Sequence, residues 1–202
     1  QLQQLFESAE NPYVQVRPIW VMAQLGPKGQ GYVRNLLNSR NPQHRLVAYR
    51  ALRFAQPAGL IPMANKMAGD KDPSVRREVA LSLRDVPYAK AKRALAQVID
   101  GYDGKNRWYL EAIGAGSVGN EDRVYDELVS PNHAKTSPAE WGDRVKNLAW
   151  RLHTPQAIED LHAMIKTQKP TIEDFRRWVM GYAGYRNNTE RKQYKAQLES
   201  LA

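Results

Sequence analysis

The chain has 202 residues, a net charge of +9 and no cysteine, and 42% of its residues are apolar. The absence of cysteine excludes disulfides, thiolate metal sites and the c-type haem attachment motif. Its uncharged apolar stretches fall far short of the roughly 20 residues that a membrane span needs, so we expect a folded segment without a membrane span. The net positive charge predicts that this segment attracts acidic partners.

A short sequence motif, called the phrase below, recurs at a nearly fixed spacing. Asn or Asp is followed by Pro, and Val-Arg or Arg-Leu comes a few residues later. The prolines of the phrase are Pro12, Pro42 and Pro73, at spacings of 30 and 31 residues, and Arg76 to Arg107 is again 31. A period in this range is typical of a solenoid, in which each helix pair buries its apolar face by stacking on its neighbours.

We therefore expect one domain over residues 1–202, built from six helix pairs and a C-terminal capping helix. The repeat boundaries predicted from the phrase are 1–26, 27–56, 57–87, 88–117, 118–153 and 154–185, with the capping helix at 187–202. The first three pairs are helices around 2–6 with 13–25, 32–37 with 42–55, and 60–67 with 73–86. The last three are 88–99 with a helix from 107, 121–128 with a helix from 137, and 156–165 with 172–182.

The second helix of each early pair shows a regular buried face. Asn11, Asn41 and Asp72 are suitable N-caps, and proline fits the first helical position. The apolar positions six, ten and thirteen residues after each proline are Pro18, Ala48, Val79, then Met22, Leu52, Leu83, then Leu25, Ala55 and Val86. Pro18 is expected to kink its helix or delay the start.

The fifth pair carries its own start signal. Ser137 is expected to cap the second helix, with Glu140 completing a capping box. No segment alternates β-branched residues with a period of two, so the predicted fold class is all-α.

The run Asp72-Pro73-Ser74-Val75-Arg76-Arg77-Glu78-Val79-Ala80 resembles the second helix of a HEAT repeat. The resemblance implies a right-handed α-α superhelix, a HEAT-like solenoid. It also implies that a capping Asp and the following Arg form a ladder of polar contacts between repeats. On this basis the predicted ladder residues are Arg45, Asp72, Arg76, Arg107 and Arg144.

A narrower resemblance lies in the run from Gly101 to Gly114, which reads Gly-Tyr-Asp-Gly-Lys-Asn-Arg-Trp-Tyr-Leu-Glu-Ala-Ile-Gly. Together with the third repeat, it looks like the HEAT segment of large exported bacterial proteins of planctomycete type. Those proteins also carry a sugar-dehydrogenase-like propeller and a c-type haem domain. The resemblance implies a docking module of a periplasmic or exported protein, with redox chemistry elsewhere.

The chain begins at Gln1 without an initiator Met or an apolar signal region. We interpret it as a piece of a longer multidomain protein, or as a chain whose targeting segment has been removed.

The candidate binding residues are basic and aromatic. Four arginines lie off the buried stripe: Arg50, Arg53, Arg77 and Arg84. They either face water without a partner or form an extended basic binding surface. Trp108-Tyr109 and Arg176-Arg177-Trp178 mix aromatic and basic groups, as interface hot spots do, although packing between repeats explains them equally well. Trp20 and Trp150 are expected in the core.

Nothing in the sequence predicts catalysis, a cofactor, a metal or a small-molecule ligand. Gly114-Ala-Gly-Ser-Val-Gly119 fits the dinucleotide pattern G-x-G-x-x-G, but it follows a helical stripe and not a strand, so we interpret it as a turn. The four histidines are scattered without metal-ligand spacing.

Three function classes follow. The first is a non-enzymatic scaffold that binds a protein or a neighbouring domain of the same chain. The second is a basic nucleic-acid-binding HEAT solenoid that resembles alkylpurine DNA glycosylases in charge, size and tryptophan content, although that family's active-site pattern is not found here. The third is the redox assembly that the narrower resemblance implies, in which this segment only positions other domains.

Overall fold

The computed structural model describes residues 1–168 and 171–172. Every regular element in those residues is helical, so the prediction of an all-α helical-repeat fold is confirmed. The right-handed sense of a superhelix stays a prediction. The predicted helices at 172–182 and 189–201, and the candidate residues Arg176, Arg177 and Trp178, lie outside the described residues.

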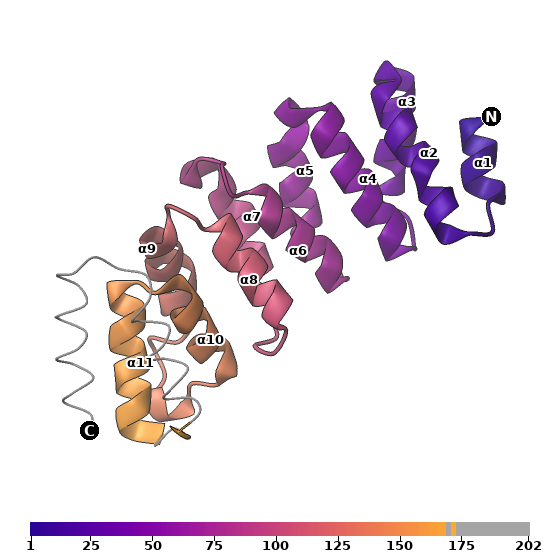
Figure 1. Cartoon of the computed structure of the whole chain (residues 1–202). Coiled ribbons are helices and arrows are strands. Elements are labelled where there is room, and N and C mark those ends of the chain that lie inside the picture. Colours follow the sequence, from indigo (N-terminus) through magenta and orange to yellow (C-terminus); the bar gives the residue numbers. More distant parts are fainter. Residues whose placement is uncertain (169–170, 173–202) are drawn as a thin grey trace. The chain divides into compact units, whose positions relative to one another are not determined.

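The chain divides into two compact units, Gln1–Gly101 and Tyr102–Ala202, and each is described by itself. Unit 1 contains seven α-helices, of which the last precedes the boundary (Figure 1). They are α1 Leu2–Ser8, α2 Pro12–Gln24, α3 Gly26–Leu36, α4 Pro42–Ala55, α5 Leu60–Met67, α6 Pro73–Ser82 and α7 Tyr88–Asp100. A 3-10 turn, Pro57–Gly59, links α4 to α5.

The helices of unit 1 pack as two rows. The second helices of the first three pairs contact one another in order, α2 against α4 and α4 against α6, while α5 contacts α7 in the other row. This is the stacking that the 30-residue period predicts, because each helix covers the apolar side of its neighbours.

The second helices begin where the sequence predicts. The side-chain oxygens of Asn11, Asn41 and Asp72 accept hydrogen bonds from backbone N–H groups in the first turns of α2, α4 and α6, at 2.9, 2.9 and 2.8 Å. Each cap satisfies a donor that has no partner within the helix. Helix α2 starts at Pro12 and runs past Pro18, so the proline does not delay its start.

The predicted inner face is confirmed at two of its three levels. Pro18, Ala48 and Val79 are buried, as are Met22, Leu52 and Leu83. The third level is wrong: Leu25 is 60% exposed, and Ala55 and Val86 are only half-buried. Helix length explains Leu25 and Val86, because α2 ends at Gln24 and α6 at Ser82, whereas Ala55 is the last residue of α4.

Unit 2 is less regular. Its helices are α8 Arg107–Gly116, α9 Glu121–Val124, α10 Asp143–Leu152 and α11 Pro155–Gln168, with a π-helical turn at Tyr125–Val129 and 3-10 turns at Ser130–Asn132 and Pro138–Glu140. Helix α10 packs against α8 and α11. The predicted capping box forms between Ser137 and Glu140, but it caps a 3-10 turn, and the helix itself begins six residues later at Asp143.

Candidate interaction surface

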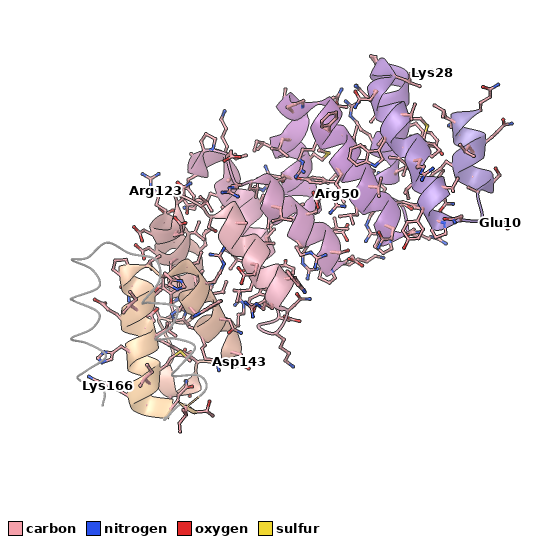
Figure 2. The ribbon with its side chains drawn as sticks, viewed as in Figure 1. Glu10, Lys28, Arg50, Arg123, Asp143 and Lys166 are labelled. Carbon is pink, nitrogen blue, oxygen red and sulfur yellow. The ribbon has the colours of Figure 1, made fainter. Side chains whose placement is uncertain are left out.

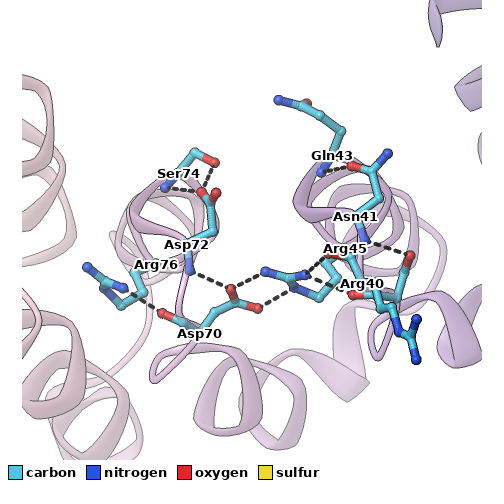
Figure 3. Close-up of polar contacts among 9 residues, drawn as sticks. Arg40, Asn41, Gln43, Arg45, Asp70, Asp72, Ser74 and Arg76 are labelled. Carbon is cyan, nitrogen blue, oxygen red and sulfur yellow. Dashed lines mark hydrogen bonds and ion pairs between the residues drawn. The ribbon is translucent and has the colours of Figure 1, made fainter.

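A ladder of buried polar contacts joins α4 to the turn between α5 and α6 (Figure 3). The Arg45 side chain is 6% exposed, and its guanidinium donates two hydrogen bonds to the Asp70 carboxylate, at 2.7 and 2.6 Å. It also donates to the carbonyl oxygens of Ser39 and Arg40, at 2.8 and 3.2 Å. The hydrogen bonds to Asp70 raise the pKa of Arg45 above its usual value, so the pair stays charged.

Arg76 continues the ladder toward α7. Its guanidinium donates to the carbonyl oxygen of Asp70 at 2.6 Å and to that of Gly101 at 2.9 Å. The backbone N–H of Asp72 donates to the Asp70 carboxylate at 2.8 Å. The turn before α6 is therefore held from both sides, and Asp70, which the sequence did not single out, is its centre.

Asp72 has a local role. Its carboxylate caps α6, and hydrogen bonds from the Ser74 hydroxyl and backbone lower its pKa below the ordinary value. Arg107 is a correction to the predicted ladder, because its side chain is 73% exposed and lies 3.8 Å from Glu111 in the same helix. Arg144 is half-buried, and its backbone nitrogen lies against Gly104.

Two arginines predicted to face water also hold a buried carboxylate. Glu78 of α6 is 5% exposed, and its oxygens lie 2.5 Å from the Arg50 guanidinium and 3.4 Å from that of Arg53. Both arginines come from α4, and Arg50 is labelled in Figure 2. Arg50 and Arg53 are thus part of the packing between α4 and α6, while their side chains stay 45% and 36% exposed, and partner binding by them stays a prediction.

Tyr49 lies fully buried beside this pair. Its hydroxyl is 2.7 Å from the Ser82 hydroxyl, which donates to the Val79 carbonyl at 2.6 Å. Burial raises the pKa of Tyr49 to about 12, so it stays neutral at ordinary pH.

An exposed face with apolar and basic side chains remains on the second helices of unit 1. The position eight residues after each repeat proline is exposed in all three, as Trp20, Arg50 and Leu81. Trp20 is 40% exposed, Leu81 44% and Phe54, one turn after Arg50, 72%. Arg77, which is half-buried, precedes Leu81 by one turn of α6, and the exposed Arg84 lies in the turn that follows the end of α6 at Ser82.

We call these residues the second-helix face: Trp20, Arg50, Phe54, Arg77, Leu81 and Arg84. Within the described residues Arg77 and Arg84 form no ion pair with a carboxylate. The placement of Trp20 corrects its expected core position. Phe54 and Leu81 were missed, although their offsets of twelve and eight residues from the repeat prolines were readable from the sequence.

Trp108 and Tyr109, neighbours in unit 2, differ in exposure. Trp108 is 73% exposed, as an interface residue requires, whereas Tyr109 is 2% exposed and stacks on Tyr102 with ring centroids 5.7 Å apart. Successive helical residues point about 100° apart, so a pair of neighbours rarely shares a face. Tyr109 is therefore a core residue and not a contact residue.

The glycine pattern at 114–119 is not a phosphate loop. Gly114 and Gly116 lie inside α8, and no strand precedes them in the described part of unit 2. Gly114 instead leaves room for the guanidinium of Arg151, which donates to Glu111 at 2.8 Å. A Cβ on Gly114 would lie 2.0 Å from the Arg151 Cζ.

A closed polar network in unit 2 has the residue types of a catalytic site. Asp160 of α11 accepts hydrogen bonds from the Tyr125 hydroxyl at 2.7 Å and from Gln156 at 3.0 Å, and its carboxylate lies 2.8 Å from the His133 Nε2. Tyr125, His133 and Asp160 are exposed by 0%, 5% and 7%. A substrate cannot reach groups buried in this way, so the network serves packing between α11 and the preceding turns.

The described residues offer neither a metal site nor a membrane span. They contain no group of three or more His, Asp or Glu side chains placed to hold a metal ion. None of the helices resolved in residues 1–168 has the length and apolar character needed to cross a bilayer.

Residues 31–114 match the family model for HEAT repeats. This part of the chain is therefore a HEAT-like helical repeat, and it runs from α3 through α8. HEAT repeats commonly mediate protein interactions. Comparison with curated proteins and with solved structures gives no significant match.

Proposed function

We propose that this chain is a non-catalytic scaffold that binds an acidic protein, or a neighbouring acidic domain of the same polypeptide, on the second-helix face. The observation that carries the proposal is the exposure of Trp20, Phe54 and Leu81 on three helices that contact one another in order, with Arg77 and Arg84 beside Leu81. Large exposed apolar groups beside arginines are the composition of protein-binding hot spots.

Charge supports an acidic partner. Residues 1–101 contain 15 Lys and Arg against 7 Asp and Glu, so unit 1 carries +8 of the chain's +9. Unit 2 has 15 against 14, which leaves +1. A field of this size speeds the approach of an acidic surface, while the apolar side chains contribute the affinity after desolvation.

The test selects ligands from a displayed random-peptide library on the intact protein and measures the selected peptides by fluorescence anisotropy. Phe54→Ser with Leu81→Ser, and separately Arg77→Glu with Arg84→Glu, should weaken binding by about ten-fold or more. Lys90→Glu with Arg93→Glu makes the same charge change on exposed positions of α7 and is the matched control.

Arg50 and Arg53 are left intact in this design, because their loss would unpair buried Glu78 and destabilise unit 1. Peptides without acidic residues, or equal losses in the α7 control, would contradict the proposal.

A second candidate function is nucleic-acid binding by unit 1, as in the DNA-glycosylase-like alternative, and the concentration of positive charge in residues 1–101 favours it. Phosphate contacts predict that log affinity for duplex DNA falls linearly with log salt. Absence of binding to micromolar duplex at low salt would reject this function.

The wider context proposed is a large exported or periplasmic dehydrogenase-like protein with a c-type haem domain. It rests on the resemblance of the run Gly101–Gly114 and on the HEAT match that ends at residue 114. The reading frame that surrounds this segment tests it, because a propeller or a Cys-x-x-Cys-His motif should lie in the same polypeptide.

A further inference from the structure

Unit 1 has a pocket of about 330 Å³ that the second-helix face does not include. It lies where α3, the end of α4 and the start of α5 meet, elements that Figure 1 shows in sequence along the unit. Leu37 and Leu52, exposed by 7% and 2%, line it together with Met63. Its volume falls at the small end of the range for binding pockets, and its lining is mostly apolar.

Two cations stand at this pocket without a carboxylate partner. Arg34 of α3 donates a hydrogen bond to the Gln56 side-chain oxygen, and the Gln56 amide in turn donates to Gln30. Lys66 of α5 donates to the Asn38 side-chain oxygen at 2.9 Å. Both partners are neutral amides, and no ion pair to either cation occurs among residues 1–168. The amides fix the position of the Arg34 guanidinium without neutralising its charge.

The partial charges of the helix ends at the pocket do not change the sign of its electrostatic potential. Helix α4 ends beside it at Gln56, where free carbonyls favour a cation, while α5 begins beside it after Gly59, where free N–H groups favour an anion. These two partial charges oppose each other. The full charges of Arg34 and Lys66, together with the net +8 of unit 1, therefore decide that the pocket attracts anions.

We propose that this pocket binds an acidic peptide segment, which inserts one apolar side chain between two carboxylates. The cations come from different helices and the apolar lining lies with them in one pocket, so a ligand with the order acid, apolar, acid matches both features. The site is separate from the second-helix face and does not depend on the function proposed for that face.

The test uses the intact chain and a fluorescein-labelled peptide that carries Asp-Leu-Asp in a Gly/Ser background, measured by anisotropy at low salt. Replacing both acids by Asn should weaken binding about ten-fold, and replacing the Leu by Ser should also weaken it about ten-fold. Arg34→Gln and Lys66→Gln should each weaken binding about three-fold, because both groups are exposed and partly screened.

Lys71→Gln is the matched control, because it removes one exposed charge of unit 1 outside the pocket. It should leave the affinity unchanged, as should Leu81→Ser on the second-helix face. Equal loss in Lys71→Gln would show a general attraction to a basic surface and overturn the site. Hexanoate, a small carboxylate with an apolar chain, is tested in parallel. If it binds and the peptide does not, the pocket is a site for small carboxylates and the peptide is ruled out as its ligand.

Discussion

Asp70 is the residue on which the ladder of unit 1 depends most. Its carboxylate is 7% exposed and accepts from the Arg45 guanidinium and from the backbone of Asp72, while its carbonyl accepts from Arg76. The Asp72 carboxylate also acts on Arg45 through space, but Asp70 is the carboxylate that Arg45 binds by hydrogen bonds. Removing the Asp70 carboxylate therefore leaves a buried cation without its hydrogen-bonded counter-charge.

Asp70→Ala should lower the free energy of unfolding by about 3 kcal/mol, the usual result of breaking one side of a buried ion pair. Urea unfolding followed by circular dichroism measures this as a lower midpoint at unchanged slope. Asp85→Ala removes an exposed carboxylate of the same unit and should change stability by less than about 0.5 kcal/mol. A loss below about 1 kcal/mol for Asp70→Ala would show that Arg45 is satisfied by its carbonyl partners alone.

Gly104 is the other position where one residue type is required. Its φ is +81°, a Cβ there would lie 2.9 Å from the Arg144 nitrogen, and its carbonyl accepts from the Asn147 amide at 2.6 Å. Gly119 has a similar φ of +77°, but open space surrounds it. Comparing substitutions at Gly104 and Gly119 therefore separates the cost of backbone strain from the cost of a steric collision.

Gly104→Ala should destabilise unit 2 by about 3 kcal/mol, since a left-handed residue costs about 1 kcal/mol and a collision with backbone atoms about 2 kcal/mol more. Gly119→Ala should show only the first part, about 1 kcal/mol. Thermal or urea unfolding of the two variants provides the comparison. Equal losses would mean that the turn before α8 moves aside to accept the methyl group.

At the level of elements, Asp160 fixes α11 to the turns that precede it. Burial acts to raise the pKa of Asp160, but the hydrogen bonds from His133, Tyr125 and Gln156 outweigh burial and hold that pKa below the ordinary value. The folded state therefore gives up this proton more readily than the unfolded chain. The resulting stability is complete above the ordinary Asp pKa of about 4 and is lost as pH falls through the lower folded value.

Asp160→Asn should consequently flatten the acid limb of the stability curve of unit 2, besides lowering stability at neutral pH. Urea midpoints from about pH 6 down to about pH 3, followed by tryptophan fluorescence, measure it. Glu159→Gln, on the exposed side of the same helix, is the control and should keep the acid limb. An unchanged limb in Asp160→Asn would assign the acid sensitivity to other carboxylates.

The elements that were predicted well are those with strong local signals. The structure has α4 at Pro42–Ala55 and α5 at Leu60–Met67, both with the predicted bounds, because an Asn-Pro start and a clear apolar period act over a few residues. Ser137 shows the limit of such signals. A capping box stabilises whichever helical turn follows, and here the turn closes after Glu140.

The residues that were missed depend on partners distant in sequence. Glu78 looks like a solvated charge within a Val-Arg-Arg-Glu-Val run, and only the approach of α4, 28 residues earlier at Arg50, buries it. Asp70 is likewise paired across 25 residues. Trp20 was assigned to the core on residue type alone, whereas its position in the repeat, shared with Arg50 and Leu81, predicts exposure.

At the scale of the whole molecule, charge is distributed unevenly between the two units. Unit 1 carries +8 and unit 2 +1, so repulsion among like charges opposes the folding of unit 1 far more than that of unit 2. Salt should relieve this repulsion. Between about 0.01 M and about 0.15 M, the screening length shortens from about 30 Å to about 8 Å.

We therefore expect amide hydrogen exchange in α4 and α6 to slow by roughly two- to five-fold over that range of salt, with exchange in α10 unchanged. The buried pair of Arg45 and Asp70 is little affected by screening, whereas the half-exposed pair of Arg50 and Glu78 weakens and acts in the opposite direction. Arg84→Glu with Lys90→Glu lowers the charge of unit 1 from +8 to +4 through two exposed positions, so its response to salt should be smaller. If exchange slows equally in α4 and α10, salt has a general effect on folding. If exchange in α4 and α6 becomes faster, the ion pair of Glu78 outweighs the repulsion.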